Sequence, residues 1–374
     1  MPDNHLVIAY NTCWYVYMFR LPLIRAFLER GWRVTVLAPR DEYTGRVVAT
    51  GAEHRHLDLD ARGTNPLREL SAVRRFKDAY RELEPVVALQ YTIKPDIYGS
   101  IAAGSLGVPV INTITGLGTM FSGGPREILA RQLYRYAFRR ADLVLFQNSD
   151  DRALFIRGGM VRQDRTGLVP GSGVDTDRFA PRPRGDGPFT FLLVARLLKA
   201  KGVEDFIAAA RSVRSKQPKA QFVLLGSHDP RDPECVEDSK LKEAESEGII
   251  HRYSHVDDIR PFLAASDCVV LPSYYREGVP RSLLEAASMG KPLIAADSVG
   301  TREPVRDAEN GFLCKPRDPA DLAEKMEAIL AMSRAQRARL GESSRRYMKE
   351  RFDERIVISV YIEAVDRLAG MGRS

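Results

Sequence analysis

Short apolar runs alternate with charged, amphipathic stretches along the first half of the chain. Five of these runs have the length and composition of buried parallel strands: Leu6–Tyr10, Val34–Ala38, Val86–Leu89, Val108–Asn112 and Leu143–Gln147. Helix-like segments lie between them at Leu21–Arg30, Leu67–Leu83 and Glu127–Arg140. Such alternation predicts βαβ units, in which helices cover both faces of a parallel sheet.

The same pattern starts again in the second half. The expected strands are Phe189–Val194, Ala220–Leu225, Ile249–Tyr253, Cys268–Leu271 and Pro292–Ala295, and the expected helices are Gly202–Ser215, Asp258–Ala265, Arg281–Gly290 and Pro319–Met332. A stretch rich in Gly, Pro and Asp separates the two sets, which is typical of a linker. We therefore expect an α/β protein with two doubly wound, Rossmann-like domains at 1–170 and 188–350, a linker at 171–187 and a last helix within 351–374.

Composition agrees with a globular protein. Of the 374 residues, 44% are hydrophobic and 28% charged, which excludes a mostly disordered chain. No apolar run reaches 18 residues, and the run Leu6–Phe19 lacks the basic start of a signal peptide, so we expect a buried strand followed by a loop there. The four cysteines lie far apart in the sequence, which argues against a zinc site or a disulfide framework and favours the cytoplasm.

The net charge is +7, and most of it lies in the first half. Residues 1–180 carry 24 Lys and Arg against 19 Asp and Glu. Such an excess suggests an anionic partner, which could be a membrane surface, a nucleic acid or a phosphorylated substrate.

Ligands of open α/β sheets bind at the carboxyl ends of the strands, so the residues that follow each strand are the candidates for chemistry. Arg196, Lys201 and Gly202 follow the expected strand Phe189–Val194. Two cations beside the start of a helix favour a diphosphate, because the helix dipole and both side chains attract negative charge. A solvated basic turn is the alternative interpretation.

Two glutamates follow the strand Cys268–Leu271. Glu277 lies in the loop, Pro280 fits the first turn of a helix, and Glu285 falls about one turn into that helix. Because helical side chains lean toward the helix start, Glu285 should point toward the same place as Glu277. Backbone N–H groups at 281–283 could hold a phosphate, and Glu285 could accept hydrogen bonds from two ribose hydroxyls. The alternative is a loop salt bridge with a surface glutamate.

Together these residues resemble a known family. The motifs Arg196-x4-Lys201-Gly202, Glu277-Gly-x6-Glu285, Gly300-Thr-Arg-Glu303 and Asn310-Gly311 are similar to those of the retaining family 4 glycosyltransferases of the GT-B fold. The resemblance implies two Rossmann-like domains that face each other across a cleft, with the last helix crossing back to the first domain. It also implies that Arg196 and Lys201 neutralise the donor diphosphate, that Glu277 contacts the donor sugar and that Glu285 holds the ribose.

The resemblance extends to further donor contacts and to the acceptor. The expected donor-binding residues are Arg196, Lys201, Val256, Glu277, Gly278, Val279, Pro280, Arg281, Ser282, Leu283 and Glu285, of which Glu277, Arg196 and Lys201 are the catalytic candidates. The first half, through Tyr91-Thr-Ile-Lys94-Pro95-Asp-Ile-Tyr98-Gly99 and Asn112-Thr-Ile-Thr115-Gly116, resembles bacterial enzymes that extend undecaprenyl-diphosphate-linked glycans. The expected acceptor-binding residues are Asn11, Tyr15, Arg20, Lys94, Thr115 and Gly116, with Lys94 on the acceptor diphosphate.

This sequence departs from the wider family at two places. Many members have a Gly-rich loop where this chain has Asn11 to Arg20, and many have His-Gly where it has Thr115-Gly116. The role of that histidine therefore has no side-chain counterpart here. Backbone groups at 115–118 are the expected substitute.

Neither the histidines nor the Asp-x-Asp pairs predict a metal site. His54 and His56 alternate as on a strand edge, and the pairs Asp58/Asp60 and Asp175/Asp177 are of a frequent kind. A diphosphate site built from Arg and Lys has no need of Mg²⁺. We therefore expect no cofactor and no metal.

A membrane surface is the expected anionic partner, and no nucleic-acid fold is recognisable. We expect an aromatic loop at Trp14–Phe19 and a basic helix face at Arg131, Arg135 and Arg139 to rest on anionic lipid. The alternative is that the aromatic residues belong to the core and the arginines are solvated.

These inferences lead to one predicted function and two alternatives. The prediction is a retaining hexosyltransferase, peripheral on the cytoplasmic face of the cell membrane, that moves a hexose or N-acetylhexosamine from a UDP-sugar to a polyprenyl-diphosphate-linked saccharide. The alternatives are a nucleotide-sugar epimerase of the GT-B fold and a non-catalytic nucleotide-sugar-binding subunit.

Overall fold

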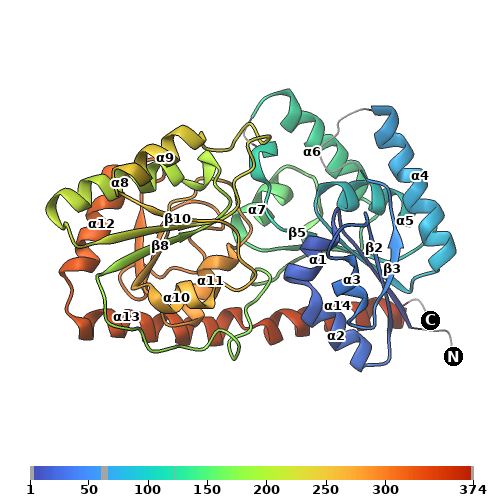
Figure 1. Cartoon of the computed structure of the whole chain (residues 1–374). Helices are drawn as coiled ribbons and strands as arrows, with labels where there is room; N and C mark the ends of the chain where they lie inside the picture. Colours follow the sequence, from blue (N-terminus) through green and yellow to red (C-terminus); the bar gives the residue numbers. More distant parts are fainter. Residues whose placement is uncertain (1–3, 60–65, 122, 372–374) are drawn as a thin grey trace. The chain divides into compact units, whose positions relative to one another are not determined.

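A computed structural model of the protein describes residues 4–59, 66–121 and 123–371. The chain divides into two compact units (Figure 1). The first unit is Met1–Ser172 with Arg355–Ser374, and the second is Gly173–Glu354.

The first unit is built on a seven-stranded sheet in which every pair of neighbouring strands is parallel. In sheet order the strands are β3 (Glu53–His56), β2 (Arg33–Ala38), β1 (His5–Ala9), β4 (Val87–Tyr91), β5 (Val110–Ile114), β6 (Leu143–Phe146) and β7 (Thr166–Leu168). The chain order reverses once, between β1 and β4.

Helices cover both faces of this sheet (Figure 1). They are α1 (Cys13–Phe19), α2 (Leu21–Glu29), α3 (Thr44–Val48), α4 (Pro66–Leu83), α5 (Ser100–Gly104), α6 (Pro125–Phe138), α7 (Ser149–Arg157) and α14 (Glu354–Met371), with short helical turns at Pro95–Gly99, Gly118–Phe121 and Gln163–Arg165. Alternate residues of β1 enter different cores, because successive side chains of a strand point to opposite faces. Leu6 and Ile8 pack with α2 and α14, while Val7 and Ala9 pack with α4 and α5.

The last helix, α14, belongs to the first unit. Its residue Tyr361 is fully buried, and the Tyr361 hydroxyl is 2.8 Å from the Thr113 hydroxyl at the end of β5. The guanidinium of Arg20, itself 1% exposed, lies 4.1 Å from the ring centre of Tyr91 and 5.8 Å from that of Tyr361. A buried cation among aromatic rings gains cation–π attraction, so these contacts tie α14 to β4 and β5.

The second unit has a six-stranded parallel sheet. In sheet order its strands are β10 (His251–Tyr253), β9 (Gln221–Leu225), β8 (Thr190–Val194), β11 (Cys268–Leu271), β12 (Leu293–Ala296) and β13 (Gly311–Cys314). Its helices are α8 (Val203–Lys216), α9 (Asp238–Ser246), α10 (Arg260–Ala265), α11 (Arg281–Ser288), α12 (Pro319–Ala331) and α13 (Arg334–Tyr347), with short turns at Lys199–Lys201 and Met348–Phe352. Helices α8, α9 and α12 pack on one face, and α10 and α11 on the other.

The chain enters and leaves the second unit at adjacent places. The Val174 N–H donates to the Phe352 carbonyl at 2.8 Å, and the Glu354 N–H donates to the Val174 carbonyl at 3.0 Å. The Thr176 hydroxyl donates to the Asp353 carboxylate at 2.6 Å. The part of the expected linker from 173 onward therefore belongs to the second unit, and the division between the units falls at 172/173.

Several elements differ from the sequence-based expectations. Strands β3 and β7 were not predicted, because they are short and exposed or half-buried, so they lack the apolar run of a central strand. Strand β13 was missed as well, although its residues are apolar and Gly311 and Cys314 are buried. Residues Trp14–Phe19 are helical rather than a loop. The Thr12 hydroxyl accepts a hydrogen bond from the Tyr15 N–H at 3.2 Å and starts this helix, and Cys13 and Val16 are fully buried.

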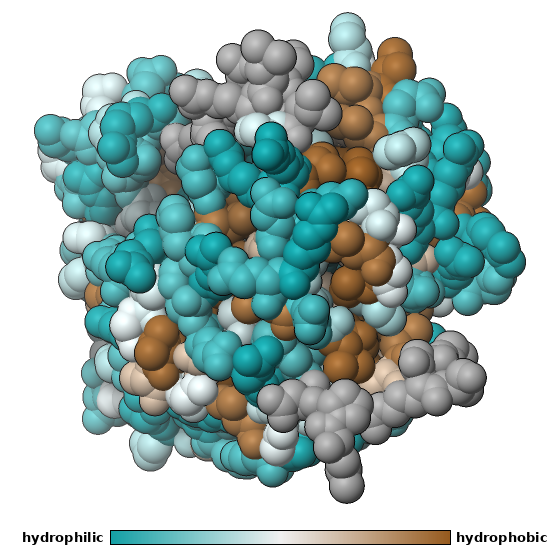
Figure 2. Space-filling model, turned by 90° about the vertical axis from the view of Figure 1, so that its right-hand side faces the viewer, coloured by the Kyte–Doolittle hydropathy of each residue, from teal (hydrophilic) through white to brown (hydrophobic). Residues whose placement is uncertain are grey.

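Two surface features complete the description. Among the described residues, no helix combines the length and the apolar content that crossing a bilayer requires. Figure 2 shows the side of the molecule that is on the right in Figure 1, where separate hydrophobic patches interrupt a mostly hydrophilic surface. Such patches are ordinary on a folded protein, so a hydrophobic patch alone does not indicate a binding surface.

We predict that Tyr361→Phe lowers the free energy of unfolding of the first unit by about 1–3 kcal/mol, because the buried Thr113 hydroxyl loses its partner. The measurement is urea unfolding followed by tryptophan fluorescence, since both tryptophans, Trp14 and Trp32, lie in this unit. The double variant Tyr361→Phe/Thr113→Val should recover part of the loss. An unchanged urea midpoint in the single variant would contradict the assigned bond.

Candidate functional site

The candidate charged residues of the second unit follow the two strands at which its strand order reverses. Arg196 and Lys201 follow β8, and Glu277 follows β11, the neighbour of β8 in the sheet. The helices after these strands, α8 and α11, pack on opposite faces. The loops therefore diverge at the carboxyl edge, which is the place where open α/β sheets bind their ligands.

Lys201 and Glu277 form an ion pair there. Each side chain is 12% exposed, and the Ser273 hydroxyl also donates to the Glu277 carboxylate, at 3.0 Å. The Lys201 ammonium lies 5.2 Å from the ring centre of Tyr275. A partly buried charge is costly without a partner, so the pair keeps both ionised groups stable at this edge.

Backbone contacts hold the two loops together. The Ala200 carbonyl accepts hydrogen bonds from the N–H groups of Tyr274 and Tyr275, both at 3.0 Å. Gly300, with φ of 77°, lies so close to the loop that a Cβ there would overlap the carbonyl oxygens of Glu277 and Gly278. The loop after β12 thus supports the loop that carries Glu277, and only glycine permits that approach.

Glu285 and Arg281 form a second ion pair, within α11. The Arg281 Nε donates to the Glu285 carboxylate at 2.7 Å, and the Glu285 side chain is 10% exposed. Burial raises the pKa of Glu285 above its usual value, and the Arg281 guanidinium opposes that shift. The structure therefore gives the two glutamates different cationic partners.

The start of α11 offers fewer N–H groups than expected. Pro280 precedes the helix and makes no side-chain capping hydrogen bond. The Leu283 N–H, however, donates to the Pro280 carbonyl at 3.2 Å. Of the N–H groups at 281–283 that we expect to hold a phosphate, the one at Leu283 therefore also has a partner within the first turn.

The other expected donor residues vary in exposure. Arg196 is exposed and pairs with no carboxylate of the described residues. Gly278, Val279 and Pro280 are buried in the loop before α11, and Ser282 is half-buried at the start of that helix. Val256 is half-buried after β10 and packs on the core of the second unit.

The carboxyl edge of the first sheet contains buried polar atoms without partners. They gather after β1 and β4, where that sheet reverses its strand order, and belong to Asn11 (Oδ1), Tyr91 (hydroxyl), Thr92 (Oγ1) and Asp96 (both carboxylate oxygens). Buried polar groups are nearly always hydrogen-bonded in proteins, so a group of unsatisfied ones marks a place where a ligand or water supplies the partners.

Two of these residues carry further strain. Thr92 has φ of 70°, a left-handed conformation that a β-branched residue rarely adopts. Asp96 is fully buried, and this burial raises the pKa of its carboxyl well above the usual value. Both features cost free energy of folding.

The expected acceptor residues of the first unit divide into two groups. Asn11, Lys94, Thr115 and Gly116 are half-buried at the carboxyl ends of β1, β4 and β5, as expected. Tyr15 stacks on Tyr10 and Phe19 with ring centres 6.0 Å apart, and Arg20 is buried as described above. Their packing places these two residues with the core, and the burial of Arg20 does not fit direct contact with an acceptor.

Two family models match this chain, one for each unit. "Glycosyl transferases group 1" matches residues 175–347, and "Glycosyl transferase 4-like domain" matches residues 19–172. The chain belongs to the glycosyltransferases.

Relatives and solved structures agree with this family. A Campylobacter jejuni N,N'-diacetylbacillosaminyl-diphospho-undecaprenol α-1,3-N-acetylgalactosaminyltransferase is 27% identical, over 94% of this chain and 96% of that protein. An Escherichia coli UDP-Gal:α-D-GlcNAc-diphosphoundecaprenol α-1,3-galactosyltransferase is 29% identical, over 61% of this chain and 62% of that protein.

The fold is confirmed by solved structures. A glycosyltransferase from Rickettsia africae has a TM-score of 0.82 at 14% identity, covering 98% of this chain and 99% of that chain. Anabaena Alr3699/HepE in complex with UDP has a TM-score of 0.79 at 19% identity, covering 97% of this chain and 100% of that chain. This glycosyltransferase therefore has the expected GT-B fold.

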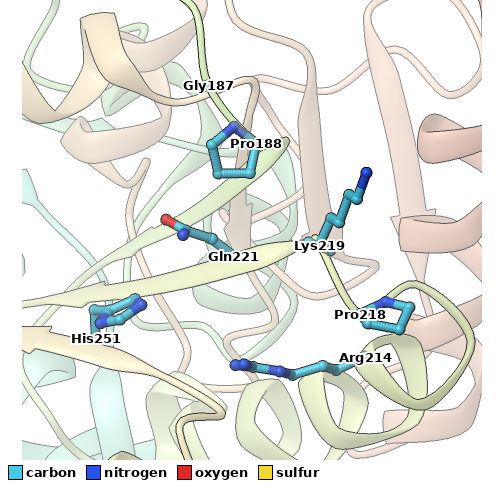
Figure 3. Close-up of a pocket in the computed structure, with 8 residues that line it drawn as sticks. Gly187, Pro188, Arg214, Pro218, Lys219, Gln221 and His251 are labelled. Carbon is cyan, nitrogen blue, oxygen red and sulfur yellow. The ribbon is translucent and has the colours of Figure 1, made fainter.

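A surface hollow of about 520 Å³ lies at the other edge of the second sheet (Figure 3). It is lined by Gly187, Pro188, Arg214, Pro218, Lys219, Ala220, Gln221 and His251. Gln221 and His251 are the first residues of β9 and β10, so this hollow is at the amino edge of the sheet. It contains none of the expected site residues.

The structure corrects the expected membrane surface. None of the residues 14–19 is exposed, because these residues form the packed helix α1. Arg131 pairs with Glu127 at 2.6 Å, and Arg135 donates to the Gly158 carbonyl at 2.8 Å, so both are engaged within the protein. Of the three expected arginines only Arg139 is exposed.

Sequence reasoning missed four residues of these edges. Ser273 and Thr301, the latter with a buried and unpartnered hydroxyl, lie in loops at the carboxyl edge of the second sheet, and Thr92 and Asp96 lie at that of the first sheet. Gly300 and Thr301 stand in a recognised motif without an assigned role. No signal in a single sequence shows that a small polar residue will be buried without a partner. In the described part of the chain, no group of three or more His, Cys, Asp or Glu is arranged to hold a metal.

We predict that Gly300→Ala lowers the free energy of unfolding of this glycosyltransferase by about 3 kcal/mol, through overlap with the Glu277 loop and strain at positive φ. Thermal unfolding followed by circular dichroism measures it. Gly185→Ala is the matched control, since a Cβ at Gly185 meets no atom within 4 Å, and its effect should stay within about 0.5 kcal/mol. Equal effects of the two variants would refute the close approach.

We predict that Asp96→Asn stabilises the first unit at pH 7 and that its advantage shrinks toward pH 4. The unfolded chain releases the Asp96 proton near pH 4, whereas burial keeps it bound in the folded state. The contribution of Asp96 to wild-type stability therefore falls as the pH rises above about 4, by up to about 1.4 kcal/mol per pH unit, and Asn lacks this contribution. Urea unfolding at several pH values, read by tryptophan fluorescence, measures the difference. A difference that is constant with pH would contradict the buried neutral carboxyl.

Proposed function

We propose that this glycosyltransferase moves a hexose or N-acetylhexosamine from a UDP-sugar to a saccharide linked to a polyprenyl diphosphate, with retention of configuration, at the cytoplasmic face of the cell membrane. The observation that carries the donor half is the arrangement of Arg196, Lys201 and Glu277 at the β8/β11 reversal. The names of the Campylobacter jejuni and Escherichia coli relatives, which include diphospho-undecaprenol acceptors, support the acceptor half.

The donor edge has the charges that a nucleotide diphosphate needs. Arg196 is exposed and pairs with no carboxylate among the residues that the structure describes, and Lys201 lies a few residues further on, directly before α8. Cations that are already in place stabilise the charge that develops on a leaving diphosphate, since they need no reorganisation during the reaction. Glu285 is the proposed acceptor for the two ribose hydroxyls.

Glu277 and Lys201 have linked roles in this proposal. Without a donor, each neutralises the other at the edge of the sheet. A bound UDP-sugar brings a diphosphate for Lys201 and sugar hydroxyls for Glu277, so both can exchange one partner for another without an uncompensated charge. The ion pair of the free protein thus keeps the site ready for the donor.

The acceptor half rests on the polar edge of the first sheet. Lys94 is the proposed contact of the acceptor diphosphate, and Asn11, Thr115 and Gly116 are the proposed contacts of its saccharide. The unsatisfied oxygen of Asn11 and the hydroxyl of Thr92 match the hydroxyl and amide groups of a sugar.

No side chain is proposed as a general base. A leaving phosphate oxygen that accepts the proton of the acceptor hydroxyl, on the same face of the sugar, would account for retention of configuration. The cations at Arg196 and Lys201 would stabilise that leaving group, so we also propose that the reaction needs no metal ion.

The test of this function is release of UDP from four donors, UDP-GalNAc, UDP-GlcNAc, UDP-Gal and UDP-Glc, with and without a polyprenyl-diphosphate-linked saccharide. We expect release with one donor that depends on the acceptor and persists in EDTA. Interconversion of the donor sugars without acceptor would indicate an epimerase. Binding of UDP without any turnover would indicate a binding subunit.

We predict that Lys201→Met lowers kcat by about 10²- to 10³-fold, because the charge on the leaving diphosphate loses a preorganised cation. Lys199→Met, in the same helical turn, is the matched control and should stay within about twofold. The double variant Lys201→Met/Glu277→Gln also removes the carboxylate charge that loses its Lys201 partner in the single variant. If Lys201→Met is as active as Lys199→Met, the role of Lys201 is refuted.

A further inference from the structure

Helix α6 of the first unit exposes an unusual amount of apolar surface. Ile128 is 63% exposed, Leu129 is 61% exposed and Tyr136 is 50% exposed. These are three of the seven large hydrophobic side chains that are exposed in the described part of the chain, and the other four lie on four different elements. Scattered exposed residues are ordinary, but a group on one helix is not.

The exposed residues share one side of the helix. At 100° per residue, Ile128, Leu129, Gln132 and Tyr136 fall within an arc of about 100°. The opposite side carries Ala130, Tyr134, Ala137 and Phe138, which are buried in the core of the unit. The exposed apolar residues therefore do not belong to the core, because a different side of the helix packs on it.

Exposed arginines flank this outer side. Arg126 lies in the first turn, Arg139 and Arg140 follow the last turn, and all three are exposed. The Arg140 guanidinium lies 6.0 Å from the ring centre of Tyr136. The acid of the helix, Glu127, is engaged by Arg131 and by the Gly123 N–H at 2.7 Å, so the face has a net positive charge.

We propose that this α6 face, made of Arg126, Ile128, Leu129, Gln132, Tyr136, Arg139 and Arg140, docks on an anionic membrane surface. Apolar side chains that enter the headgroup region, with cations at the lipid phosphates, are the two components of interfacial binding. The proposal rests on the proposed function in one respect, because a lipid-linked acceptor places the substrate at such a surface.

Charge distinguishes this partner from a second copy of the chain. Two copies that met through the α6 face would bring their exposed arginines against one another, and like charges in a contact are unfavourable. An anionic bilayer instead supplies the opposite charge along the whole face. The membrane is therefore the partner that the charges favour.

The test is sedimentation of the purified full-length protein with lipid vesicles. We expect binding to vesicles that contain phosphatidylglycerol, weaker binding to pure phosphatidylcholine, and a decrease with added salt. Arg139→Gln/Arg140→Gln should weaken binding to the anionic vesicles about 25-fold, at about fivefold for each arginine near the surface. Ile128→Ser/Leu129→Ser should weaken it about tenfold.

The matched controls remove exposed apolar and basic side chains that lie outside the α6 face. Val48→Ser/Ile356→Ser removes two exposed apolar side chains of the first unit, and Arg231→Gln/Lys242→Gln removes two exposed cations of the second unit. Both controls should bind as the wild type does. Binding by the α6 variants equal to that of the controls would overturn the proposal. So would a wild-type dimer, seen by light scattering, that the α6 variants convert to a monomer.

This experiment can fail independently of the proposed function. Vesicle binding needs neither donor nor acceptor. The vesicle sedimentation would therefore give the same result even if the protein showed no turnover in a UDP-release assay. Conversely, turnover on a detergent-solubilised acceptor should be the same in the α6 variants and the wild type. A protein that turns over but does not bind vesicles would overturn the docking surface alone.

Discussion

A single reversal of strand order organises each unit of this protein. In a parallel sheet with right-handed connections, the helices on either side of a reversal pack on opposite faces, so the loops between them separate at the carboxyl edge. The second unit reverses between β8 and β11, and Lys201 and Glu277 meet there. The first unit reverses between β1 and β4, and the unsatisfied atoms of Asn11 and Asp96 lie there. The chemistry of both units follows from this topology.

The carboxyl edges of the two sheets differ in how their buried polar groups are paired. At the carboxyl edge of the second sheet, charges are paired: Lys201 with Glu277, and Arg281 with Glu285. At the edge of the first sheet, polar atoms such as Asn11 Oδ1 are buried without partners. Paired charges suit a ligand that exchanges one ionic partner for another, as a diphosphate does. Unsatisfied neutral groups suit a ligand that brings hydroxyl groups, as a saccharide does.

Aromatic and basic residues have separate roles that the sequence does not distinguish. The aromatic residues at 14–19 and Arg20 serve the interior of the first unit, where Arg20 lies between the rings of Tyr91 and Tyr361. The residues that face outward, such as Ile128, Leu129 and Arg140, belong to a helix that the sequence pattern predicts but whose orientation it does not. A pattern of residue types shows that a helix is amphipathic, and only packing shows which of its sides is covered.

The sequence by itself determined the two βαβ series, the central strands and the motif residues that follow β8 and β11. It could do so because central parallel strands are continuous apolar runs, and because ligand residues lie directly after strands. Tertiary structure alone decided the rest. The edge strands β3 and β7 are held by pairing rather than by burial, whereas β13 also buries Gly311 and Cys314. The pairing of Lys201 with Glu277, the Leu283 hydrogen bond and the burial of Arg20 depend on residues distant in sequence or on local geometry, which no residue pattern contains.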